Sequence, residues 1–156
     1  MINFEQPTVD LIREVHNKFI VAGIDYRYTG LTAANAYGFG ISTNVLDIAV
    51  DSEDTVYHAK EVLELEKPKW NTYDPYVYEH DYKDGYFFYV RIQGDILGEC
   101  HYHPKLGILL HNKELLLPRL SIYANHCGRT MKAAAYIALT IDADKIEKYK
   151  EYWNHL

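Results

Sequence analysis

The sequence predicts one α+β domain over residues 1–156, in which helices flank a sheet. Three observations lead to this expectation. Helical and extended patterns alternate through the first 66 residues, the middle of the chain is rich in tyrosine and turn residues, and the end is helical again. A chain of 156 residues can bury one substantial core, and no linker-like tract divides it.

The first half alternates between helix and strand. Apolar residues recur at helical spacing behind Thr8, a good helix N-cap, and Gly23 follows the last of them. The expected elements are a helix over 9–22, a strand over 25–29, a short alanine-rich helix over 31–38, a buried strand over 44–50, and a helix capped by Asp51 or Ser52 that ends near residue 66.

The second half is expected to begin as a β-meander and to end in helices. A hairpin is predicted around the turn at residues 82–85, and Pro104 separates two further strands. From Pro118 onward the pattern is helical. The expected elements are strands over 76–80, 86–93, 96–103 and 106–112, and helices over 121–127, 130–139 and 142–153.

The net charge of −6 argues against a protein that coats nucleic acid by electrostatics alone. The charge is uneven: residues 1–66 contain 4 basic and 11 acidic side chains, whereas residues 67–156 contain 12 and 11. A basic contact surface must therefore come from the second part of the chain. The candidates for binding nucleic acid are Arg119, Arg129 and Lys132, with Lys113 beside them.

Membrane association and export are not expected. No run of 18 apolar residues occurs, and the N-terminus lacks the basic and then apolar layout of a signal peptide. Two cysteines, Cys100 and Cys127, do not form a disulfide framework, although a single bridge between them stays open. The expected location is the cytoplasm.

Residues 30–50 join a glycine turn, an alanine-rich helix and an apolar strand that contains Asp47. Together with the preceding helix and strand, this order resembles the minimal nucleotidyltransferases associated with toxin–antitoxin systems, over about residues 10–66. In that family a Gly-Gly or Gly-Ser turn precedes a short helix, and the next strand carries Asp-x-Asp. The resemblance implies a nucleotidyltransferase-like mixed sheet flanked by helices, with a C-terminal helical pair. It also implies a divalent cation, Mg²⁺ or another, held by two carboxylates on one strand face.

Two positions depart from that family pattern. Leu31 stands where the family has its second glycine or serine. When Thr43 is aligned with the threonine that precedes the family's aspartates, Val45 takes the first metal position and Asp47 the second. Asp95 or Glu99 could add a ligand, but the carboxylate pair is missing. The metal site is therefore interpreted as eroded, which is evidence against nucleotidyl transfer.

A second resemblance covers more of the chain. The segments TGLTAANAYG (29–38) and SIYANHCGRTMKAAAYIAL (121–139) are similar to the effector half of abortive-infection antitoxins and related archaeal regulators. The Arg-Gly turn of those proteins is reversed here as Gly128-Arg129, and their N-terminal winged helix is absent from this sequence. The resemblance implies a role in viral or archaeal defence or in mobile-element biology. The alternative interpretation is a small-residue helix packed on a sheet.

Two further clusters could carry metal chemistry. Glu99, His101 and His103 alternate along an expected strand and would share one face, where two histidines and a carboxylate form a known ligand set. Asp81 and Lys83 form an Asp-x-Lys pattern close to Glu79 and Asp74. Restriction-type nucleases use such a pattern to hold Mg²⁺ and activate water. A solvent-facing histidine strand and a charged hairpin turn are the simpler alternatives.

These observations favour a nucleotidyltransferase-fold protein with an eroded metal site that acts as a binding module, with nucleic acid or a partner protein as its ligand. The first alternative is a metal-dependent nuclease with Glu79, Asp81 and Lys83 as catalytic residues, joined by Asp47. The second alternative is an active nucleotidyltransferase. Either enzyme would need Mg²⁺ or another divalent cation as its cofactor.

Overall fold

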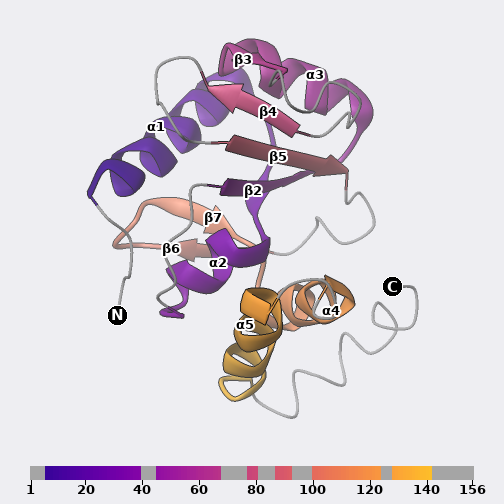
Figure 1. The fold of residues 1–156 in the computed structure, drawn as a ribbon. Helices are drawn as coiled ribbons and strands as arrows, with labels where there is room; N and C mark the ends of the chain where they lie inside the picture. The colour runs from indigo at the N-terminus through magenta and orange to yellow at the C-terminus, as the bar shows by residue number, and fades with distance from the viewer. Residues whose placement is uncertain are drawn as a thin grey trace.

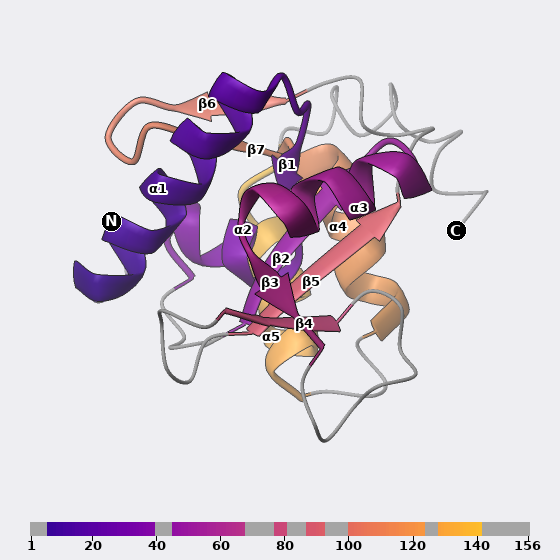
Figure 2. The same ribbon diagram turned by 90° about the horizontal axis from the view of Figure 1, so that it is seen from above.

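The described residues form a seven-stranded mixed sheet with helices on both faces, as the α+β expectation requires (Figures 1 and 2). A computed structural model describes residues 6–39, 45–67, 77–80, 87–92, 100–123 and 128–141. The strand order is β3-β4-β5-β2-β1-β7-β6. The strands are β1 (Arg27–Tyr28), β2 (Val45–Val50), β3 (Leu65–Glu66), β4 (Val77–His80), β5 (Phe87–Ile92), β6 (His101–His103) and β7 (Ile108–Leu110). The helices are α1 (Gln6–Ala22), α2 (Gly30–Ala36), α3 (Glu53–Val62), α4 (Lys113–Tyr123) and α5 (Gly128–Ala138).

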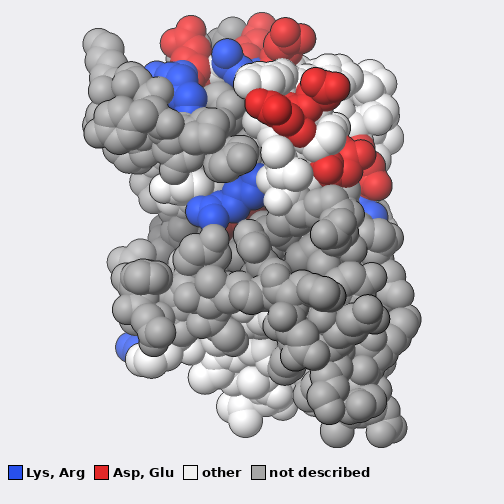
Figure 3. Space-filling view, turned by 90° about the vertical axis from the view of Figure 1, so that its right-hand side faces the viewer, with Lys and Arg blue, Asp and Glu red and all other residues white. Residues whose placement is uncertain are grey.

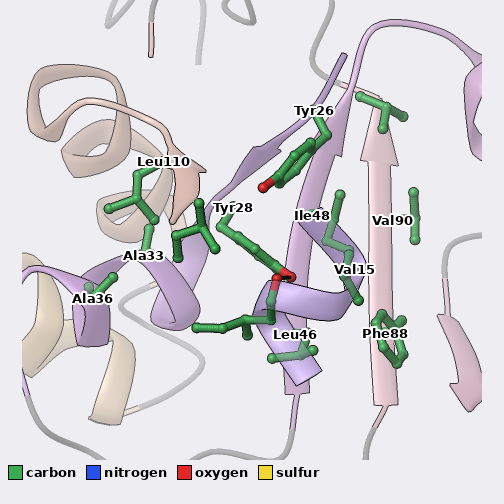
Figure 4. Packing of buried hydrophobic residues seen from close by; sticks show 14 of the residues in the cluster. Val15, Tyr26, Tyr28, Ala33, Ala36, Leu46, Ile48, Phe88, Val90 and Leu110 are labelled. Atoms are coloured by element: carbon green, nitrogen blue, oxygen red, sulfur yellow. Dashed lines mark hydrogen bonds between the residues drawn. The ribbon is translucent and has the colours of Figure 1, made fainter. Parts of the chain in front are cut away.

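The main core lies between the sheet and α1 (Figure 4), and α3 packs against α1 and β5. Strands β2 and β5 run parallel, with Ile48 paired to Val90. Their alternate apolar residues, Leu46, Ile48, Phe88 and Val90, are fully buried on the α1 face. The hydroxyl of Tyr28 donates a hydrogen bond to the Ile12 carbonyl of α1 (3.0 Å), which attaches β1 to the same layer. Period-two burial therefore leaves the odd-numbered residues of β2 on the opposite face.

The expected start of α1 and the expected end of α3 were wrong. Helix α1 begins at Gln6, so Thr8 lies inside it and is not its cap. Helix α3 has the expected cap, because the Ser52 hydroxyl accepts from the Thr55 amide (3.3 Å), but it ends at Val62 and not near residue 66. Glu64 takes a left-handed conformation (φ 53°), and the next two residues form β3 beside β4. That pairing depends on a distant strand, so local helical periodicity could not reveal it.

The expected meander is divided into two hairpins. The β4–β5 hairpin lies on one side of β2. The β6–β7 hairpin lies on the other side, where Leu110 of β7 pairs with Tyr28 of β1 in parallel. The placement buries Ile108 and Leu110 in the core next to Tyr28. Strand order of this kind is decided by burial between distant segments.

Helix α5 confirms the first helix of the predicted C-terminal pair, and α4 and α5 pack against each other and against α2. Helix α4 begins at Lys113, whereas the sequence suggested a start at Pro118. Proline removes one helical hydrogen bond, but buried Leu116 and Leu120 on either side of it hold the helix in place. The helix expected over 142–153 lies outside the described residues.

In the part of the chain that the structure describes, none of the helices combines the length and apolar character needed to cross a lipid bilayer.

Candidate functional site

Asp47 occupies the middle of β2, on the sheet face opposite α1. Val45 and Ala49 share that face at the adjacent alternate positions, and Tyr89 of β5 is the cross-strand partner of Asp47. On the other side, the Thr29 amide donates to the Asp47 carbonyl (2.9 Å). Asp47 therefore lies at the centre of the sheet, next to the start of α2.

The carboxylate of Asp47 caps helix α2 from the neighbouring strand. Thr29 holds the N-cap position, but its side chain makes no capping hydrogen bond. Instead, the backbone amides of Leu31 and Thr32 bond to the Asp47 carboxylate. The Thr32 hydroxyl also accepts from the Asp47 amide (2.9 Å) and donates to the Val45 carbonyl (3.2 Å). Helix α2 is thus attached to β2 through both backbone and side chain.

Gly30 is required by this arrangement. Its φ of 56° lies in the left-handed region, which L side chains rarely adopt. A Cβ at this position would lie 2.7 Å from Oδ2 of Asp47 and 2.9 Å from its Cγ. Only glycine lets the carboxylate approach the first turn of α2 this closely.

The surroundings of Asp47 favour its neutral form. Part of the side chain remains accessible to solvent, but desolvation by the surrounding protein raises the pKa of Asp47 to about 6. The positive charge of Arg91 and the Leu31 and Thr32 amides act in the opposite direction and limit the rise. Arg91 follows Tyr89 by two residues on β5, and its guanidinium lies 5.0 Å from the centre of the Tyr89 ring.

The described neighbours of Asp47 do not supply the carboxylate pair that a nucleotidyltransferase metal site needs. The positions around it carry Val45, Ala49, Thr29 and Tyr89, and the charge that acts on Asp47 is the cation of Arg91. Within the ranges that the structure describes, no group of three His, Cys, Asp or Glu side chains is placed to hold a metal ion. The described residues around Asp47 therefore do not by themselves fit a divalent cation. Asp95 and Glu99 lie outside the described residues.

The structure describes two of the three residues of the histidine cluster. His101 and His103 lie on β6 with ring centres 6.4 Å apart, as their alternation predicts. Nδ1 of His103 accepts from the Leu106 amide (3.1 Å), and burial lowers the pKa of this histidine. Because Glu99 lies outside the described residues, metal binding by the three side chains stays a prediction. Cys100, before β6, is exposed and has a free thiol, whereas Cys127 is not described.

The nuclease residues are largely beyond the described ranges. Asp74, Asp81 and Lys83 are not described, and Glu79 is described only by its backbone in β4. Strand β5 lies between β4 and β2, so these two strands are about 10 Å apart, or two strand spacings, and the register places Glu79 across from Val45 and not from Asp47. A nuclease built on these residues stays a prediction.

The basic candidates belong to the two helices α4 and α5. Arg119 belongs to α4, and Arg129 and Lys132 belong to α5, which packs against α4. Lys132 is exposed. Acidic side chains gather instead over α3, at the opposite end of the molecule (Figures 1 and 3). The exposed acidic residues of this region are Asp51, Glu53, Asp54, Glu61 and Glu64.

Sequence reasoning missed three residues that organise the site. Thr32 forms hydrogen bonds with Asp47, and the charge of Arg91 acts on its carboxylate. Tyr37, just after α2, donates a hydrogen bond to the His111 carbonyl. The i, i+2 spacing of Tyr89 and Arg91 could have placed both on one face of a strand, but not beside Asp47. That neighbour relation depends on the parallel pairing of β2 with β5.

Comparison with known proteins bears on the fold. No family model matches the chain, and no curated protein matches it. The structure is similar to the solution structure of the antibiotic-resistance factor ANT(2'')-Ia, with a TM-score of 0.66 and 12% identity over 96% of this chain and 92% of that chain. It is also similar to the crystal structure of ANT(2'')-Ia in complex with adenylyl-2''-tobramycin, with a TM-score of 0.66 and 10% identity over 96% of this chain and 98% of that chain. The chain therefore has a nucleotidyltransferase-like fold.

Proposed function

We propose that this chain is a nucleotidyltransferase-fold binding module whose metal site is eroded and which does not transfer nucleotidyl groups. One observation carries the proposal: the Asp47 carboxylate bonds to the first amides of α2, and the preceding same-face position is Val45. In the resembling family, the backbone of the glycine turn approaches phosphate. Here the Asp47 carboxylate accepts hydrogen bonds from those amides. The positive charge of Arg91 lies close to the same carboxylate.

The charges around Asp47 support the absence of metal chemistry. Two carboxylates at i and i+2 can hold one hard cation against a triphosphate. Asp47 offers one carboxylate, which is already hydrogen-bonded to two amides. A cation bound there would have to compete with these amides and with Arg91. Nucleotide would in turn lack the metal that bridges its phosphates.

The metal site can be tested by restoring the missing ligand. We expect wild-type protein to bind Mn²⁺ no better than millimolar by electron paramagnetic resonance, whereas Val45→Asp gains at least about tenfold in affinity because it recreates the pair with Asp47. Val45→Asn is the matched control, because asparagine has the shape of aspartate without its charge. Equal Mn²⁺ affinity in Val45→Asp and Val45→Asn would contradict an arrangement in which only the carboxylate at position 45 is missing.

Transfer itself is tested with labelled ATP, Mg²⁺ and candidate acceptors, with tobramycin among them because a similar fold was solved with adenylyl-2''-tobramycin. The expected result is no labelled product above the EDTA control. Mg²⁺-dependent label transfer that disappears in Asp47→Asn would establish the active nucleotidyltransferase instead.

The ligand that we propose for the module is nucleic acid, contacted by the α4–α5 pair. Arg119, Arg129 and Lys132 lie on two helices that pack together, far from the acidic surface over α3 (Figures 1 and 3). This separation supports a local basic contact on a chain of net charge −6, because phosphate would be repelled from the acidic end.

Nucleic-acid binding can be measured by fluorescence anisotropy with labelled DNA and RNA at several salt concentrations. We expect Arg129→Ala with Lys132→Ala to weaken binding about tenfold and to reduce the slope of log affinity against log salt by about 1 for each lost phosphate contact. Lys60→Ala, on the acidic α3 side, removes one positive charge and is the control for Lys132→Ala alone. If Lys60→Ala has the same effect, the binding is not specific to the helical pair.

A further inference from the structure

Helix α2 is anchored to β2 at its N-terminal end. The Leu31 and Thr32 amides hold the Asp47 carboxylate, and the Thr32 hydroxyl bridges two backbone groups of β2. The two bonds of the Thr32 hydroxyl join residues that are 13 and 15 positions apart in the sequence. A change in the Asp47 side chain must therefore act first on the N-terminal turn of α2.

The C-terminal end of α2 is anchored to four other segments, mainly through Tyr37. The Tyr37 hydroxyl donates to the His111 carbonyl, between β7 and α4 (2.6 Å), and the Tyr37 carbonyl accepts from the Tyr136 hydroxyl of α5 (3.1 Å). Lys113 of α4 lies 5.2 Å from the centre of the Tyr37 ring, and the ring of His101 on β6 lies 5.8 Å away.

The helix between these two anchors is short and closely packed. Residues 32–36 are all buried, and three of them are alanines. A helix of this length measures about 10 Å along its axis, so its two ends are linked by about two turns of rigid backbone. In a close-packed interior, displacement of one end is transmitted to the other and is not absorbed by voids.

We propose that α2 couples the side chain of Asp47 to the helical pair α4–α5, with Tyr37 as the positioning residue. Removing the carboxylate loosens the first turn of α2, the displacement reaches Tyr37, and the contacts of Tyr37 with α4 and α5 weaken. The coupling itself goes beyond the proposed function and does not depend on it. Its consequence for nucleic-acid affinity rests on the proposed function.

Amide hydrogen exchange of the whole chain, without any ligand, tests the coupling. We expect Asp47→Ala to raise the exchange rates of α5 amides at least about fivefold relative to those of α1, which packs on the other face of the sheet. Thr32→Val should act in the same direction, because it cuts the side-chain link between α2 and β2 without changing charge. Asp51→Asn removes an exposed carboxylate just after β2 and should leave the α5-to-α1 ratio unchanged.

The decisive comparison uses a variant in which the hydrogen bonds at the C-terminal end of α2 are removed. Tyr37→Phe with Tyr136→Phe removes both hydroxyl bonds and keeps both rings. In that background, Asp47→Ala should no longer change the α5-to-α1 ratio. The proposal is overturned if Asp47→Ala changes the ratio equally with the anchor intact and cut, or if it accelerates exchange in α1 and α5 alike. Failure to bind nucleic acid would not affect either outcome, so the two proposals fail separately.

Discussion

Gly30→Ala is expected to lower the free energy of unfolding by about 2–4 kcal/mol, measured by urea denaturation. A left-handed conformation costs an L residue about 1–2 kcal/mol. The added Cβ would meet Oδ2 of Asp47 at 2.7 Å, so the carboxylate must move away from the amides of Leu31 and Thr32. Leaving such hydrogen-bonding groups unsatisfied costs about 1–3 kcal/mol.

The chain offers a matched control for Gly30→Ala. Gly23 also has a left-handed conformation (φ 72°), but a Cβ there would meet nothing within 4 Å. Gly23→Ala should therefore show only the backbone cost of about 1–2 kcal/mol. Adding Asp47→Ala to Gly30→Ala removes the two shortest contacts and leaves only the Cβ at position 47, 3.1 Å away, so the two substitutions together should cost less than the sum of their separate effects. If Gly30→Ala costs no more than Gly23→Ala, the close approach of the Asp47 carboxylate is wrong.

Asp47 is also expected to make folding stability depend on pH. Its pKa rises from 3.8 to about 6 on folding, so the folded protein binds this proton more tightly than the unfolded chain does. The contribution of this carboxyl group to the free energy of unfolding is greatest below pH 4. It falls as the pH rises through about 6, and it is lower by on the order of 3 kcal/mol at pH 8.

Asp47→Asn removes that titration and retains an oxygen that can accept from α2. Relative to wild type, this variant should therefore gain about 3 kcal/mol of stability between pH 4 and pH 8, in paired urea denaturations. The comparison with wild type cancels the contributions of the other carboxylates. Asp51→Asn, which changes an exposed side chain, is the control for loss of one negative charge. Parallel pH profiles for wild type and Asp47→Asn would contradict a carboxyl group that is desolvated on folding.

The parts of the fold that depend on residues close together in the sequence were predictable. The apolar spacing of α1, the Ser52 cap of α3 and the β4–β5 hairpin were all indicated by local patterns. The end of α3 and the position of the β6–β7 hairpin were not. Both are decided by strand pairing between distant segments, which local propensity does not encode. The start of α4 was missed because Pro118 suggested a helix boundary, whereas burial of the leucines around it holds a helix across the proline.

For the candidate site, the sequence by itself determined the unit of Gly30, a small-residue helix and a strand with Asp47. Each part follows from local conformation: a glycine at positive φ, a helix of small residues and a strand with period-two burial. Only the tertiary structure decided that the Asp47 carboxylate caps α2 beside Arg91, and that Tyr37 reaches His111, 74 positions away. These contacts depend on the register between strands and on the packing of α2 against α4 and α5. Both are set by burial across the whole chain and have no local signature.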